Sequence, residues 1–113
     1  MQLDFYHNFK ECWEQIEKVG KDYALAKAKS WHFQESVGAV KASIMSKMGD
    51  ISVAKAEIVA KCDSGYLKHL KDTEAAIHEE MRLKATLDGL KTIFEAYRSL
   101  SSLEKAQINA EGH

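Results

Sequence analysis

The sequence of 113 residues contains no proline and only six glycines, the two residue types that most often end helices and form turns. It has two cysteines, Cys12 and Cys62, and no CxxC pair. No uncharged apolar run approaches the roughly 18 residues that a membrane span needs, and no secretory signal is visible. These absences argue against a turn-rich β fold, a disulfide scaffold and a membrane protein. We expect a cytoplasmic protein with reduced thiols.

Strong helix formers are abundant in the chain. The strong helix formers Ala, Lys, Glu and Leu are among its most frequent residue types. Hydrophobic residues make up 45% and charged residues 29% of the chain. The length allows one domain with a modest core. The composition therefore predicts a single all-α domain over residues 1–113.

The clearest pattern is a row of twelve positions, spaced three or four residues apart, that continues for 40 residues with only one polar member. Such a period of 3.5 residues is typical of a long helix that packs in coiled-coil fashion. We therefore predict a helix over about residues 4–48. The row consists of Phe9, Cys12, Ile16, Val19, Tyr23, Ala26, Ser30, Phe33, Val37, Val40, Ile44 and Met48.

Local signals suggest where the remaining elements begin and end. Gly49 suits the position after a helix, so residues 49–52 are the expected turn. A second helix is expected over about 53–100, with a possible kink at 63–65. The capping-box pattern Ser-x-x-Glu at Ser101 predicts a short last helix over about 102–110. The apolar positions of the second half include Ala56, Val59, Tyr66, Leu70, Ile77, Leu83, Leu87, Leu90, Phe94 and Tyr97.

Several large apolar side chains fall outside these rows, among them Leu25, Trp31, Leu67 and Met81. Two helices that pair once bury only one stripe each, so the additional stripes need additional partners. The fold expected is a long antiparallel helical hairpin or a small bundle, with self-association into a homo-oligomer.

The net charge of −1 conceals a basic middle: residues 23–71 hold eight lysines and four acidic residues, which gives +4. Lysines mixed with aromatic rings can hold single-stranded nucleic acid without reading its sequence. Solvated lysines and rings packed in the core remain open alternatives. Because Lys61, Lys68 and Lys71 are seven and three residues apart, they are expected near one helix face. The candidate DNA-binding residues are Lys41, Lys47, Lys55, Lys61, Lys68, Trp31 and Tyr66.

No group of residues suggests catalysis. The segment that begins His78-Glu79 lacks the second histidine of a zinc-protease motif, and Glu74 with His78 offers only two ligands. The chain has no Gly-rich phosphate loop and no nucleophile motif. We therefore expect a non-enzymatic protein without a metal or cofactor.

Three segments carry a likeness to a known family: residues 23–31, with Tyr23 and Trp31; residues 53–61, with Lys55 and Lys61; and residues 87–108. They resemble the UvsY-like recombination mediators of bacteriophages. The resemblance implies a cytoplasmic phage protein that forms oligomers and binds single-stranded DNA. Such proteins help load a recombinase onto strands coated with single-strand-binding protein.

Two functional hypotheses follow. The first is a phage accessory protein of recombination or replication that binds single-stranded DNA and assists recombinase loading. The second is a helical protein–protein interaction module, a scaffold or an inhibitor of a host complex, that does not contact nucleic acid.

Overall fold

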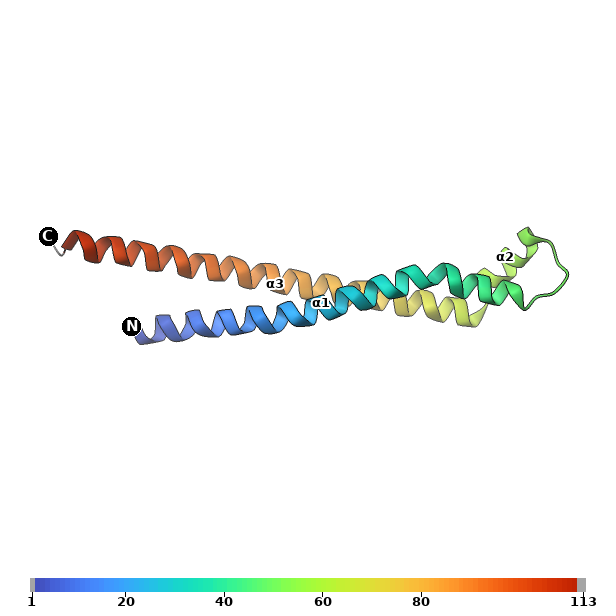
Figure 1. The fold of residues 1–113 in the computed structure, drawn as a ribbon, viewed down its shortest axis with the longest axis horizontal. Coiled ribbons are helices and arrows are strands. Elements are labelled where there is room, and N and C mark those ends of the chain that lie inside the picture. Colours follow the sequence, from blue (N-terminus) through green and yellow to red (C-terminus); the bar gives the residue numbers. More distant parts are fainter. Residues whose placement is uncertain (1, 112–113) are drawn as a thin grey trace. The chain divides into compact units, whose positions relative to one another are not determined.

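The computed structural model describes the backbone of residues 2–111 and the side chains of residues 6–111. It contains three helices: α1 (Gln2–Ser46), α2 (Val53–Lys61) and α3 (Ser64–Glu111) (Figure 1). No β-strand occurs within residues 2–111, so the predicted all-α class is confirmed.

α1 ends close to where the sequence predicts. Its last residues are followed by tight i to i+3 hydrogen bonds, from Lys47 N to the Ile44 carbonyl at 3.2 Å and from Met48 N to the Met45 carbonyl at 3.1 Å. Gly49 then adopts a φ of 70°, the left-handed conformation that glycine reaches without steric cost. The chain leaves α1 here and enters the loop before α2.

The second half of the chain is broken at Cys62 and Asp63, so one helix over 53–100 is not what forms. Ser52 begins α2 by accepting a hydrogen bond from Lys55 N. Asp63 begins α3 in the same way, because its Oδ1 accepts from Gly65 N at 2.8 Å and from Tyr66 N at 3.3 Å. A carboxylate cap at this position turns the suspected kink into the start of a new helix.

No separate helix begins after Ser101. α3 continues without interruption to Glu111, and Ser101 is a half-buried residue inside it. The expectation of a short helix over 102–110 is therefore wrong in its starting point. A serine inside a helix lowers helix stability only slightly, and the neighbouring residues Leu103, Glu104 and Lys105 are strong helix formers.

Tertiary contacts divide the chain into two compact units, where a single domain was expected. Unit 1 contains residues 1–23 and 83–113, and unit 2 contains residues 24–82. α1 and α3 each contribute to both units, so neither boundary falls in a linker, whereas α2 belongs wholly to unit 2.

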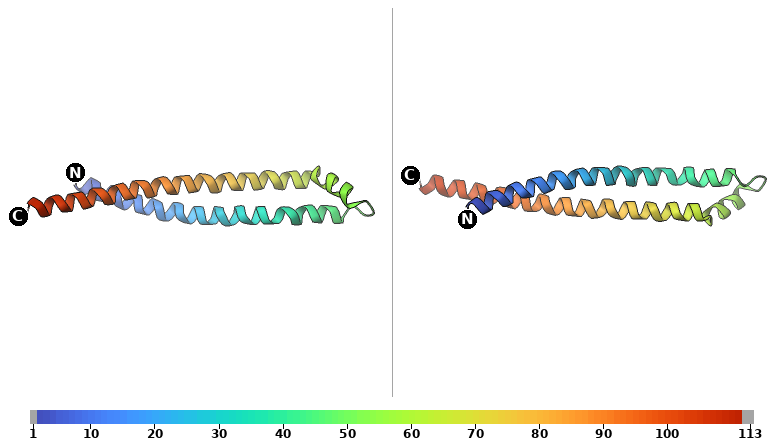
Figure 2. Two further views of the ribbon diagram at one scale, coloured as in Figure 1. Left: turned by 90° about the horizontal axis from the view of Figure 1, so that it is seen from above. Right: turned by 90° about the horizontal axis from the view of Figure 1, so that it is seen from below.

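The two long helices pack antiparallel within each unit (Figure 2). In unit 1 the rings of Phe9 and Phe94 stack with centroids 4.8 Å apart, and the Cys12 thiol donates to the Leu90 carbonyl at 3.6 Å. In unit 2 the centroid of Phe33 lies 5.4 Å from that of His69. Along these contacts the residue numbers rise on one helix and fall on the other, as expected for an antiparallel pair.

The row of positions predicted on α1 forms the helix–helix interface. All twelve residues from Phe9 to Met48 are buried or half-buried. α3 supplies a matching row with the same alternation of three and four residues. It comprises Tyr66, His69, Thr73, Ala76, Glu80, Leu83, Leu87, Leu90, Phe94, Tyr97, Ser101 and Glu104, all buried or half-buried.

The interface of unit 2 is unusually polar for a helix pair. Ser30 is 0% exposed, and its hydroxyl accepts a hydrogen bond from Gln34 Nε2 at 2.9 Å. Thr73 is also buried and donates to the His69 carbonyl at 2.7 Å. Leu70, in contrast, lies outside the interface with 37% of its surface exposed. These hydroxyls are satisfied locally, so they can sit in the interface without an unmet hydrogen bond.

The hydrophobic core is thin. Among residues 6–111 the fully buried hydrophobic side chains are few and mostly small, while many large ones are exposed. Helix pairs that leave such side chains in water commonly cover them with a further helix. The buried set is Cys12, Ala56, Ala60, Ala76, Leu83 and Leu87.

Candidate nucleic-acid interface

The lysines expected to contact DNA lie in one part of unit 2. We call residues 41–68 the hairpin end; it contains the end of α1, the loop, α2 and the start of α3. Five lysines and three acidic residues fall in this segment. The lysines are Lys41, Lys47, Lys55, Lys61 and Lys68.

Lys41 has a structural partner. Its Nζ lies 3.3 Å from Glu57 Oε1, and its side chain is only 29% exposed. The ion pair joins the end of α1 to α2. Lys41 is therefore partly withdrawn from solvent and from any phosphate.

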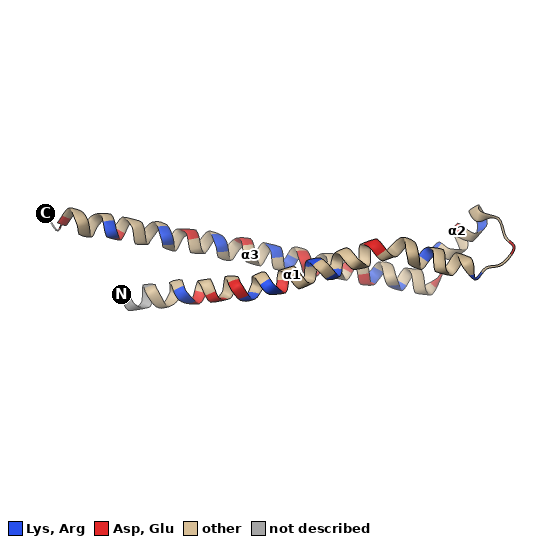
Figure 3. Ribbon diagram, viewed as in Figure 1, with Lys and Arg blue, Asp and Glu red and all other residues tan. Residues whose placement is uncertain are grey.

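The remaining four lysines are exposed, and none of them forms an ion pair with any of residues 6–111. Figure 3 marks the basic and acidic positions along the helices. Two of the three acids at the hairpin end are occupied by internal bonds: Glu57 by Lys41, and Asp63 by the first amides of α3. Asp50 is the third. The exposed amines thus present a local excess of positive charge.

The exposed lysines lie on different elements of the hairpin end and do not form one row. The break at Cys62 and Asp63 places Lys61 and Lys68 on different helices, so their expected common face does not exist. On α2, Lys55 and Lys61 are six residues apart. They point to different sides of the helix, about 240° apart when measured across the face that holds the buried Ala56 and Ala60.

The two aromatic candidates differ in exposure. Trp31 is 63% exposed on α1, ten residues and therefore about 15 Å along the helix from Lys41. Tyr66 is half-buried at a position of the α1–α3 interface. The structure thus leaves Trp31 available to stack on a base and gives Tyr66 mainly a packing role.

One side of unit 2 carries a groove of about 480 Å³, which we call the groove edge. Its lining includes Leu25 and Lys29 from α1 and Asp72, Ala75 and Glu79 from α3. The two acids here are not among the site residues predicted from the sequence, although their seven-residue spacing places them on one face of α3. Alanines give no sequence signal for a groove because they also suit any solvent-facing helix position.

The pKa of Glu79 is lowered, first by its hydrogen bond from Arg82, with Nε 2.9 Å from Oε2. The positive charges of Arg82 and Lys29 act in the same direction. The groove edge therefore carries an ionised acid on α3 facing a lysine on α1.

The other side of unit 2 carries several large apolar side chains. Leu67, Leu70, Ile77 and Met81 follow one another on the flank of α3 away from Asp72 and Glu79, and Trp31 lies on the flank of α1 away from Lys29. All except the half-buried Ile77 are exposed. We call these five residues the apolar edge.

Metal ligands are not gathered anywhere in the described part of the chain, where no three His, Cys, Asp or Glu residues form a group. The closest arrangements are exposed pairs, His7 with Glu11 at 3.7 Å and His78 with Glu74 at 3.5 Å. None of the described helices has a stretch apolar enough for a membrane span. Family models, curated proteins and solved structures yield no match to this chain.

Proposed function

We propose that the protein is a non-enzymatic accessory protein of phage recombination or replication that binds single-stranded DNA through the hairpin end and assists recombinase loading. The observation that carries this proposal is the set of lysines at positions 47, 55, 61 and 68, which are exposed and form no ion pair with any of residues 6–111, while Glu57 and Asp63 are engaged in internal bonds. Amines in this state attract phosphates and release the counterions condensed on a DNA strand.

The arrangement fits a flexible strand better than a duplex. Lysines placed around a helical end can follow a strand that bends, whereas reading a duplex requires an element fitted to a groove. Trp31 offers a ring for stacking. The resemblance to phage recombination mediators includes Lys55 and Lys61, which are both exposed on α2.

The test compares two double variants of equal charge change. Lys55→Glu with Lys61→Glu removes two amines from the hairpin end, and Lys84→Glu with Lys91→Glu does the same on the exposed surface of α3 in unit 1. Binding of a fluorescent thymidine oligonucleotide is followed by anisotropy at several salt concentrations. The first variant is expected to weaken binding at least tenfold and to reduce the salt slope by about 1.4, since each phosphate contact on a single strand contributes ~0.7.

The control variant should keep the wild-type salt slope. Equal losses in both variants would show that net charge alone governs binding, and the hairpin end would not be the site. Absence of binding by the wild type at tens of micromolar protein in low salt would remove the DNA proposal.

A second candidate function is supported by the apolar edge. Trp31, Leu70 and Met81 present apolar surface to water, and an amphipathic helix of another protein would cover it. In this reading the chain is a helical interaction module, a scaffold or an inhibitor of a host complex, without nucleic acid.

The two functions separate by mutation. For the interaction module, Trp31→Glu with Met81→Glu should release a specific partner from the tagged protein, while Lys55→Glu with Lys61→Glu retains it. If the protein binds DNA, Lys55→Glu with Lys61→Glu should instead weaken that binding. A partner identified by mass spectrometry that survives both variants would refute binding at the apolar edge.

A further inference from the structure

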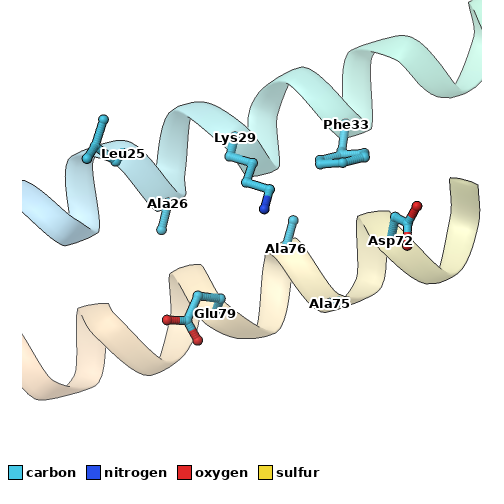
Figure 4. A pocket seen from close by; sticks show the side chains of 8 residues that line it. All are labelled: Leu25, Ala26, Lys29, Phe33, Asp72, Ala75, Ala76 and Glu79. Atoms are coloured by element: carbon cyan, nitrogen blue, oxygen red, sulfur yellow. The ribbon is translucent and has the colours of Figure 1, made fainter.

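The groove edge of unit 2 has a floor of small side chains and two charged rims of opposite sign (Figure 4). Ala26 and Ala76 are interface residues from the two helices, and Phe33 closes one end. Lys29 stands on the α1 rim, and Asp72 and Glu79 stand on the α3 rim. The alanines leave unfilled the space that larger interface residues would occupy.

A matching knob lies beside this hole. Leu25 is 72% exposed at the rim of the groove, although a leucine in water forgoes the stabilisation that burial gives. One surface therefore carries both an exposed apolar side chain and a hollow lined by alanines. A surface with a knob and a hole can pair with itself about a two-fold axis, since each copy then fills the hollow of the other.

The charges agree with this pairing. A two-fold axis that runs along the groove, in the contact plane and parallel to the helices, lays α1 of one copy over α3 of the other. Lys29 of each copy then approaches the acids of the second copy. The cationic rim and the anionic rim are therefore complementary between two copies, whereas an unrelated partner would need its own matched pattern.

The edge is long enough for a stable contact. A second hollow, of about 360 Å³ and lined by Ala39, Ser43 and Gly65 among others, lies further along it. Ala39 and Ser43 stand fourteen residues after Leu25 and Lys29, so they occupy equivalent helix positions. From Leu25 to Ser43 the edge is about 27 Å long, and two helices are ~20 Å wide. Its projected area is ~500 Å², to which the surface of the protruding side chains is added. Ordinary interfaces bury ~800 Å² per partner.

We propose that the groove edge of unit 2 is the contact surface for a second copy of this chain. Two copies pair about a two-fold axis, with Leu25 of each copy in the groove of the other and Lys29 of each beside Asp72 and Glu79 of the other. The contact leaves the apolar edge uncovered and does not use the α2 lysines, Lys55 and Lys61, which line neither hollow, and it does not depend on DNA binding.

The first test is sedimentation equilibrium of the full chain from low to several hundred micromolar. The wild type is expected to form dimers, and Leu25→Glu to raise the dimer dissociation constant at least tenfold. Trp31→Glu is the matched control, since it places the same charge at an exposed apolar position on the opposite flank of α1. Circular dichroism checks that both variants remain helical. A monomeric wild type, or a greater loss from Trp31→Glu than from Leu25→Glu, would overturn the proposal.

The second test exchanges charges between the rims. Lys29→Glu makes both rims acidic, and Asp72→Lys with Glu79→Lys makes both rims basic, so each variant alone should dimerise more weakly than the wild type. A mixture of the two should form a heterodimer that is tighter than either homodimer. Failure of the mixture to associate more tightly than its components would refute the two-fold arrangement, even if the chain proved dimeric.

Discussion

The imidazole of His69 lies against Phe33, with ring centroids 5.4 Å apart and His69 Nε2 3.1 Å from the Phe33 carbonyl oxygen. A carbonyl only accepts hydrogen bonds, so Nε2 carries the proton in this contact. The Ser36 hydroxyl donates to the same carbonyl at 3.1 Å and also lies 3.1 Å from Nε2. One polar residue thus links α1 and α3 inside the interface of unit 2.

Replacing His69 by Ala should lower the free energy of unfolding by about 1–2 kcal/mol, because it removes both a ring contact and a hydrogen bond between the helices. Urea denaturation at one protein concentration measures the change. His32→Ala, at an exposed position of α1 in the same unit, should stay within ~0.5 kcal/mol of the wild type. Equal effects of the two substitutions would contradict the role assigned to His69.

The Asp63 cap can be tested in the same way. Asp63→Ala leaves the Gly65 and Tyr66 amides without their acceptor and should cost about 1 kcal/mol of stability. Asp63→Asn retains a side-chain oxygen and should recover most of the loss. Asp50→Ala, in the exposed loop before α2, is the control. Thermal melts followed at the helical circular dichroism band would show a lower midpoint for the alanine cap variant alone.

The ion pair between Lys41 and Glu57 should be worth more than one on open surface, since its lysine is mostly shielded from water. A double-mutant cycle with alanine at both positions is expected to give a coupling of about 0.5–1 kcal/mol that weakens in salt. Arg98 and Glu95, an exposed pair one helical turn apart, should give ~0.3 kcal/mol. A coupling at Lys41 no larger than that at Arg98 would argue against its role in attaching α2.

Acid should weaken unit 2 through Glu79. The Arg82 hydrogen bond lowers the pKa of Glu79 in the folded state below its unfolded value. The stabilisation is therefore complete above the unfolded pKa and is lost as the pH falls through the folded-state value. Denaturation from neutral pH down to pH ~3 should show a smaller acid-induced loss for Glu79→Gln than for the wild type. The same loss in both proteins would show that Glu79 contributes nothing to the pH dependence.

Helix α1 shows how far apolar periodicity alone can reach. Its row from Phe9 to Met48 is almost entirely apolar, so the sequence predicts both the helix and its buried face. The first half of α3 is different, because the interface positions there include His69, Thr73 and Glu80. A search for apolar residues selects Leu70 instead, which lies outside the interface. The register in that region comes from packing against α1 and is not visible in hydrophobicity.

The candidate site was only partly predictable for a related reason. The sequence identifies which lysines are present, but their directions depend on where α2 begins and ends. The Asp63 cap separates Lys61 from Lys68, and the partner of Lys41 is a residue 16 positions away. The groove depends on alanines facing one another across two helices, a relationship that no single stretch of sequence contains.

The buried Ser30 and Thr73 have a consequence for local opening. Burial of small or hydroxyl-bearing side chains stabilises a helix interface less than burial of large apolar ones. The large apolar side chains between α1 and α3 in unit 1 include leucines and aromatic rings. Backbone amides near Ser30 and Thr73 should therefore exchange with deuterium sooner than those near Cys12 and Leu87. The hairpin end would then belong to the less tightly held unit, whose helices separate more readily than those of unit 1.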